Sequence, residues 1–183
     1  IGIIENPVQF GSTSKLDLDK ASAAYALRLT GAGWSGASFT GDSLITQTIG
    51  AGVTAVGKVI NYDETTGVLK YWQDRTMAGF STAGIAQTVT TYGYNLNRFT
   101  KEITTGGNMT IVGGSTNLSI STDFSGLSTS INNRTYYLGQ SFTDGLSNPE
   151  VKKYSGNLIY IDNRPAITRS SNQKEDIKVI LQF

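Results

Sequence analysis

The sequence of 183 residues contains no cysteine and no histidine. The absence of cysteine excludes disulfides, thiolate metal sites and a cysteine nucleophile. The absence of histidine removes the usual general base near neutral pH and the commonest metal ligand. A Ser-His-Asp triad is therefore impossible, and we predict no catalytic, cofactor-binding or metal-binding residues and a protein that is not an enzyme.

A strong charge of either sign and long apolar runs are also missing. Lys and Arg number 15 against 14 Asp and Glu, so the net charge is +1 and gives no reason to expect nucleic acid or an anionic membrane as partner. A membrane-spanning helix needs about 20 apolar residues, and no run here approaches that length. The chain starts at Ile1 without a signal-peptide pattern, and the missing initial Met favours a fragment or a processed chain.

What the sequence does contain is typical of β structure. It has 21 Gly, nine Tyr and seven Phe, while only 16% of its residues are charged. Alternation of apolar and polar residues recurs along the chain, whereas a helical period is weak. We therefore expect an all-β fold.

Residues 21–76 show short strands at regular spacing. The segment around 23–30 alternates most clearly, and further strands are expected at 43–49, 56–62 and 68–74. This spacing favours a small β-barrel or sandwich. Its expected core comprises Tyr25, Leu27, Leu29, Ile45, Ile60, Leu69, Tyr71 and Trp72.

The remaining residues, 1–20 and 77–183, are expected to form a β-sandwich-like domain into which 21–76 is inserted. A first strand should end at Asn6-Pro7, because proline removes a ladder donor. Residues 77–150 indicate long Gly/Ser/Thr-rich loops with weak strands. Those weak strands are expected at 98–103, 109–112 and near 118–120.

The C-terminal segment carries the clearest local pattern. An apolar strand at 158–161 leads into a turn at 162–165, and an alternating strand runs from 177 to 183. Pro165 fixes its own φ and restricts Arg164, which would aim the guanidinium at a carboxylate or at backbone carbonyls. A connecting turn with a solvated Arg164 is the alternative.

Other motifs have simpler interpretations. The segment 52–58 resembles a phosphate loop but has Val59 where Ser or Thr is needed and no helix after it, so we interpret its glycines as turn residues. Asp17 and Asp19 suit a solvated edge, and Asp63 should cap a hairpin turn. Paired carboxylates for glycoside hydrolysis are not indicated by any spacing.

Aromatic side chains allow two interpretations. Trp34, Tyr71 and Tyr92 could belong to a core or protein interface, or could line a shallow carbohydrate-binding groove. We favour the first and keep the second as an alternative function, a carbohydrate- or receptor-binding β module of a phage tail fibre or adhesin.

Both ends of the chain resemble one known family. The matching C-terminal features are Ser-Gly, an apolar strand with Ile-Tyr, then Asn-Arg-Pro, a Gln-x-Glu-Asp-Ile segment and a final Phe. They fall on Ser155, Gly156, Ile159, Tyr160, Asn163, Arg164, Pro165, Ile167, Gln173, Glu175, Asp176, Ile177 and Phe183. The N-terminal match falls on Ile1, Gly2, Ile3, Ile4, Asn6 and Pro7.

This pattern resembles the C-terminal portion of the baseplate wedge subunit of T-even-like contractile-tailed phages, the product of gene eight. The middle of the chain, about 11–145, departs from the family pattern and resembles an inserted β domain, and the family's large N-terminal portion is missing.

The resemblance implies a structural virion protein of the tail baseplate, assembled in the host cytoplasm. It implies a homodimer that joins other baseplate wedge subunits, without catalytic activity or cofactor. We place the predicted interface on Tyr160, Asn163, Arg164, Pro165, Arg169, Ile177 and Phe183.

Overall fold

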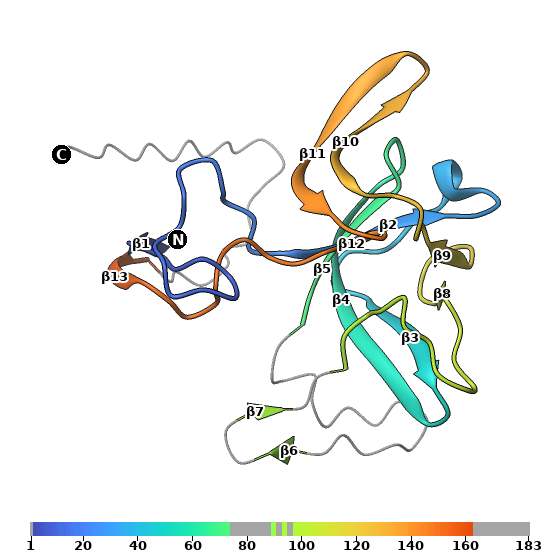
Figure 1. Ribbon diagram of the computed structural model, residues 1–183, viewed down its shortest axis with the longest axis horizontal. Coiled ribbons are helices and arrows are strands. Elements are labelled where there is room, and N and C mark those ends of the chain that lie inside the picture. Colours follow the sequence, from blue (N-terminus) through green and yellow to red (C-terminus); the bar gives the residue numbers. More distant parts are fainter. Residues whose placement is uncertain (1, 74–88, 91–92, 95–96, 163–183) are drawn as a thin grey trace, which may run out of the picture.

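The computed structural model describes residues 2–73, 89–90, 93–94 and 97–162 (Figure 1). These residues form strands joined by turns and loops, with a single turn of 3-10 helix, η1, at Trp34–Gly36. The expected all-β fold is therefore confirmed.

A seven-stranded sheet curls into a nearly closed barrel (Figure 1). Its strand order is β3 (Leu44–Gly50), β4 (Val53–Asp63), β5 (Val68–Trp72), β2 (Tyr25–Thr30), β9 (Leu118–Ile120) and β8 (Thr110–Ile111), and β12 (Leu146–Ser147) also pairs with β2. The sheet thus takes strands from both sides of the domain boundary expected at residue 76.

The barrel closes where β3 meets the chain that follows β8. The amide of Thr46 donates to the carbonyl of Val112 at 2.9 Å, and the amide of Val112 donates back to Thr46 at 2.9 Å. The amide of Asn108 adds a bond of 2.8 Å to the carbonyl of Thr48. These bonds give β3 backbone partners on its second edge, so the barrel leaves little of that edge open for pairing with another chain.

Alternate residues of the strands fill the barrel interior. In β2, Tyr25, Leu27 and Leu29 point inward and are buried. The buried core comprises Tyr25, Leu27, Leu29, Ala37, Phe39, Ile45, Ala55, Val59, Leu69, Tyr71, Phe99, Ile111, Leu118 and Ile120. Six of the eight residues expected in this core are in that set, and Trp72 is half-buried.

The prediction that Ile60 belongs to the core is wrong. Its side chain is 47% exposed. The register of β4 against β5 shifts between Val59 and Asn61, so Ile60 is the extra residue of a β-bulge. A bulge interrupts the alternation of faces, which a simple count of odd and even positions cannot anticipate.

Gly57 also departs from the interpretation given above, because it lies inside β4 and not in a turn. A Cβ at this position would come within 2.7 Å of the Tyr71 ring and 2.9 Å of the Phe99 ring. The glycine thus makes room for two core aromatic rings. Gly52, by contrast, does lie in the turn between β3 and β4, with φ of 73°.

The segment expected to consist of loops contains a well-formed hairpin. Strands β10 (Gly126–Ile131) and β11 (Arg134–Phe142) pair antiparallel and project from the barrel (Figure 1). Asn132 and Asn133 form the turn with φ of 50° and 60°. Leu138 and Phe142 of β11 pack with Ala26 and Val68 and form a second, smaller core.

Residues 98–103, expected to be a strand, contain none. This segment instead crosses the barrel and is held by side chains, with Phe99 buried in the core. The buried Gln47 donates to the carbonyl of Thr100 at 2.8 Å and accepts from the amide of Thr100 at 2.9 Å. Two-residue strands β6 (Val89–Thr90) and β7 (Gly93–Tyr94) pair with each other.

Candidate protein-protein interface

A separate two-stranded ribbon lies to one side of the barrel (Figure 1). Strand β1 (Gly2–Glu5) pairs antiparallel with β13 (Asn157–Ile161), so the ribbon joins segments from opposite ends of the chain. The expected first strand, which was to end at Asn6-Pro7, and the expected strand at 158–161 are thereby confirmed.

The ribbon is apolar and exposed. The exposed fractions are 53% for Ile4, 59% for Leu158, 64% for Ile159, 51% for Tyr160 and 63% for Ile161. A two-stranded ribbon is at best marginally stable in water. Five large apolar side chains gathered on such a ribbon therefore indicate a surface that a further element covers.

Local chemistry explains why the ribbon starts and stops where it does. Asn6 adopts φ of 47° and Pro7 follows, which ends β1. Gly156 has φ of 84°, and a Cβ there would lie 2.6 Å from the carbonyl oxygen of Glu5. The hydroxyl of Ser155 accepts from the amide of Val8 at 3.0 Å and donates to the carbonyl of Lys152 at 2.6 Å. Ser155 and Gly156 thus form the turn that leads into β13.

One predicted interface residue lies within this ribbon. Tyr160 stands opposite Ile3 in the register, and the register shifts between Ile3 and Ile4, so that Ile159 is the extra residue of a bulge. The other predicted interface residues lie outside the described part of the chain: Asn163, Arg164, Pro165, Arg169, Ile177 and Phe183. Sequence reasoning did not place Ile4, Leu158, Ile159 or Ile161 in the interface, although their apolar run was visible.

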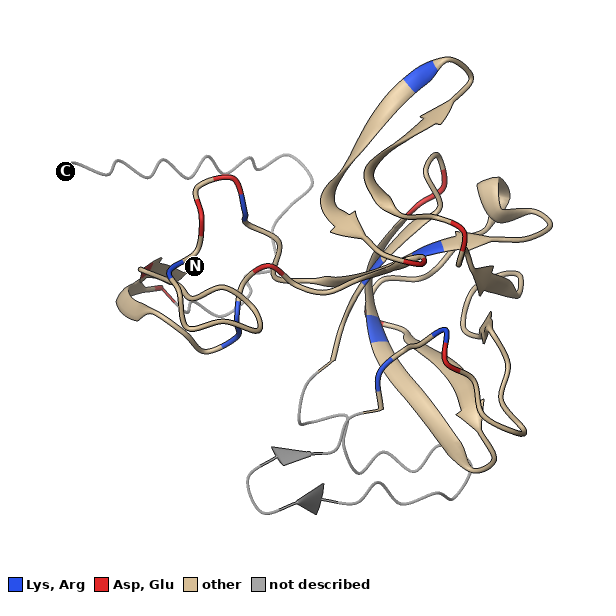
Figure 2. Ribbon diagram, in the orientation of Figure 1, with Lys and Arg blue, Asp and Glu red and all other residues tan. Residues whose placement is uncertain are grey.

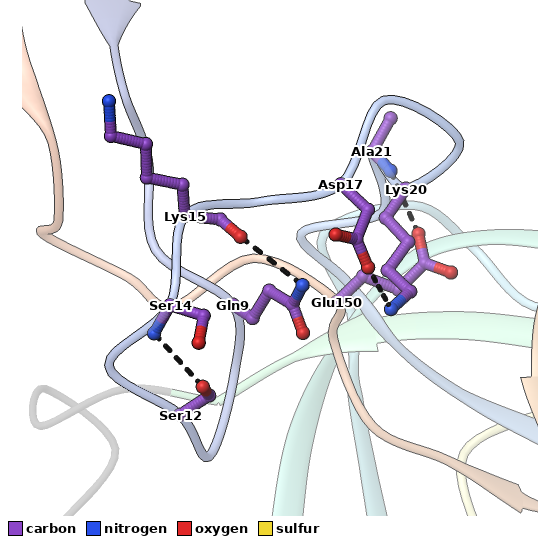
Figure 3. A network of polar contacts seen from close by, with 8 residues as sticks. All are labelled: Gln9, Ser12, Ser14, Lys15, Asp17, Lys20, Ala21 and Glu150. Carbon is purple, nitrogen blue, oxygen red and sulfur yellow. Dashed lines mark hydrogen bonds and ion pairs between the residues drawn. The ribbon is translucent and has the colours of Figure 1, made fainter.

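Two crossing segments tie the ribbon to the barrel (Figure 3). One carboxylate oxygen of Glu150 accepts from the amides of Ala21 at 2.8 Å and Ser22 at 2.9 Å. Its own amide donates to the carbonyl of Ser22 at 2.7 Å, and its carbonyl accepts from Phe10 at 2.7 Å. These four bonds fix the ribbon's connections where they leave the barrel.

An ion pair closes the neighbouring turn. The ammonium of Lys20 donates to Asp17 at 2.7 Å, and this bond holds the pKa of Asp17 below its usual value (Figure 3). Both side chains are exposed, so the pair contributes little to stability. Asp17 is thus solvated, as expected from the sequence.

Asp63 caps the β4–β5 turn as predicted. Its carboxylate accepts from the amide of Thr65 at 2.9 Å and from the hydroxyl of Thr66 at 2.6 Å. Burial alone would raise the pKa of Asp63, but these hydrogen bonds outweigh it and the pKa lies below its usual value.

The aromatic residues considered for a carbohydrate groove do not form an exposed platform together. Tyr71 is buried and stacks on Tyr25 with ring centroids 5.5 Å apart. Trp34 packs against the core with the guanidinium of Arg28 5.0 Å from its ring. Tyr92 lies outside the described residues.

Arg28 is a half-buried cation that the sequence did not single out. Its guanidinium lies between the rings of Trp34 and Phe124, at 5.0 Å and 5.7 Å, and donates to the carbonyl of Leu29 at 2.7 Å. Its Nε is buried without a hydrogen-bond partner, and burial lowers the pKa of the group. The two aromatic faces provide the compensation for this half-buried charge.

A pocket of about 200 Å³ lies between β4, β5 and β11, lined by Asn61, Asp63, Thr66, Val68, Lys70, Tyr137 and Leu138. Across the described ranges, no group of three or more acidic, Cys or His side chains is placed to hold a metal ion. Acidic and basic residues are interspersed along the described part of the chain (Figure 2). No helix within the described part is long and apolar enough to cross a membrane.

Comparison with known proteins gives no match: no family model, no curated protein and no solved structure matches this chain. The ribbon and the barrel therefore have to be interpreted from their own physical chemistry.

Proposed function

We propose that this chain is a structural protein that works by assembly with other proteins, and that the β1–β13 ribbon is its docking surface. The observation that carries the proposal is the row of exposed apolar side chains on a ribbon too small to be stable alone. Interfaces concentrate their binding energy in such apolar and aromatic anchors.

The more specific proposal is a subunit of a phage tail baseplate wedge. It is supported by the residues at both ends of the chain that resemble the wedge-subunit family of T-even-like contractile-tailed phages. Several of these have physical roles in the ribbon: Asn6 and Pro7 end β1, and Ser155 and Gly156 turn the chain into β13. The partners would be a second copy of the chain and other baseplate wedge subunits, and the location would be the virion baseplate.

Copurification with the wedge proteins of a T-even-like phage tests this proposal. Ile159→Asp places a charge on the ribbon and should weaken association about thirtyfold or more, since a central anchor contributes about 2 kcal/mol or more. The matched control is Tyr137→Asp, because Tyr137 is 79% exposed on the β10–β11 hairpin and away from the ribbon.

Sedimentation velocity of the purified chain gives the second measurement. The parent chain and Tyr137→Asp should sediment as dimers, and Ile159→Asp as a monomer at the same concentration. A parent chain that remains monomeric and binds none of the wedge proteins would contradict the proposal.

A further inference from the structure

Strand β13 has a bulge at Ile159 but none of the charged or proline residues that most often protect a sheet edge. Its five residues, Asn157–Ile161, include no charge, no proline and no glycine. Native edge strands usually carry a charge or a proline that discourages further pairing. Among the described residues, β13 pairs with β1 alone. One edge of β13 is therefore suited to accept another strand.

We propose that the chain's own C-terminal segment, residues 177–183, pairs with this edge as a third, antiparallel strand. The inference deepens the proposed function, on which it rests, because it makes a three-stranded sheet the surface that docks. It commits to one occupant, the end of the same chain, and not to a second copy.

The sequence of that segment fits a partly buried strand. Ile177, Val179, Leu181 and Phe183 alternate with Lys178, Ile180 and Gln182. Such alternation places one apolar row on one face of a sheet. Three strands with an apolar face can be stable where two are not. The exposed apolar side chains of β13 would then lie beside the apolar side chains of residues 177–183.

The chain is long enough for this return. Residues 162–176 separate β13 from the segment, and fully extended they would span about 50 Å. A return beside β13 needs far less than that reach. Strands adjacent in sequence are also neighbours in a sheet in about two-thirds of cases.

Concentration favours the same chain over a second copy. A short flexible connection holds its two ends at an effective concentration on the order of millimolar. This effective concentration exceeds that of a second copy at micromolar concentration by about a thousandfold. The apolar edge of β13 is thus occupied within the chain before another copy reaches it.

Cysteine crosslinking in the full-length chain tests the pairing without background, because the sequence has no cysteine. Ile159→Cys or Tyr160→Cys is combined with a single cysteine at each position from 177 to 183 in turn. Since a disulfide needs Cα atoms within about 7 Å, mild oxidation should join at least one such pair within one chain. The control combines Tyr137→Cys with the same tail positions and should give no intrachain bond.

Crosslinks that join two chains instead of one would overturn the proposal in favour of a second copy. The absence of a crosslink at every tail position would also overturn it. Hydrogen exchange gives an independent readout: Val179→Asp with Leu181→Asp should speed exchange of the β13 amides about tenfold or more, and Lys178→Asp with Gln182→Asp should do so much less.

The failure of this inference can be told apart from failure of the proposed function. If no tail crosslink forms but Ile159→Asp still abolishes assembly, only the third strand is wrong. If the crosslink forms and the chain still binds no wedge protein, the proposed function fails and the pairing stands.

Discussion

Gly57 illustrates how one small residue determines the packing of its surroundings. It lies in β4 directly under the rings of Tyr71 and Phe99, whose centroids are 4.8 Å apart. The two rings approach the backbone here, and this contact holds the segment around Phe99 in the barrel although that segment is not a strand. This packing adds to the two hydrogen bonds of Gln47 in holding a segment that makes no ladder bonds.

We expect Gly57→Ala to destabilise the protein by about 1–3 kcal/mol, because the new methyl group overpacks the core. Urea unfolding followed by tryptophan fluorescence measures the change. Gly36→Ala is the matched control, since a Cβ there meets nothing within 4 Å. Equal stability of Gly57→Ala and the parent chain would show that the rings can move aside.

Asp63 makes a pH-dependent contribution at the β4–β5 turn. Its pKa is lowered in the folded state, so its contribution is present above the unfolded value near 4 and is lost as pH falls through the folded pKa. The free energy of unfolding should therefore fall less between pH 7 and pH 3 in Asp63→Asn than in the parent chain. Glu64→Gln serves as control, and identical pH profiles for Asp63→Asn and the parent would refute the assignment.

At the scale of elements, the sequence predicts strands well where alternation is clean and less well where special turns are involved. The strands within 21–76 are predictable because they alternate or carry β-branched residues. The observed strands Leu44–Gly50, Val53–Asp63 and Val68–Trp72 differ from the predicted ones by a few residues at their ends. The β10–β11 hairpin was missed because Ser and Thr dominate its strands.

The missed signal was the Asn132-Asn133 pair. Asparagine tolerates positive φ, and two such residues in succession make the turn that matches strand twist. Sequence reasoning predicted the apolar strand at 158–161 and placed Tyr160 in an interface, and the structure shows this strand to be exposed. It could not find the bulges at Ile60 and Ile159, which depend on how two strands align.

The turn predicts the behaviour of two substitutions. Asn133→Gly should keep or raise the stability of the β10–β11 hairpin, since glycine adopts positive φ without strain. Asn133→Val should lower the free energy of unfolding by about 1–2 kcal/mol because a β-branched residue is strained there. Thermal unfolding followed by circular dichroism compares the two, and a Val variant as stable as the Gly variant would contradict the turn assignment.

On the scale of the whole molecule, Glu150 connects the two parts. Its side chain binds two successive amides, those of Ala21 and Ser22, where the chain passes from the ribbon to the barrel. A hydrogen bond to a charged group typically contributes about 1.5–3 kcal/mol, and an exposed one such as that to Ala21 contributes less. The orientation of the β1–β13 ribbon therefore depends on this carboxylate.

We expect Glu150→Ala to lower the free energy of unfolding by about 1–3 kcal/mol and to speed hydrogen exchange at the amides of Ala21 and Ser22. Glu150→Gln should lose less, because its amide oxygen can still accept both bonds. Exchange rates measured by NMR distinguish the variants. Unchanged exchange at both amides in Glu150→Ala would show that the backbone bonds alone hold the crossing.

Because β1 and β13 pair with each other, everything between Asn6 and Gly156 forms one loop that begins and ends at the same place. Because the two ends of this loop meet in the ribbon, surface turns within it that lie away from Glu150 can vary in length while β1 and β13 stay paired. The ribbon is thus the point at which the loop that contains the barrel is closed. An insertion into an exposed turn of the barrel should therefore leave the pairing of β1 with β13 unchanged.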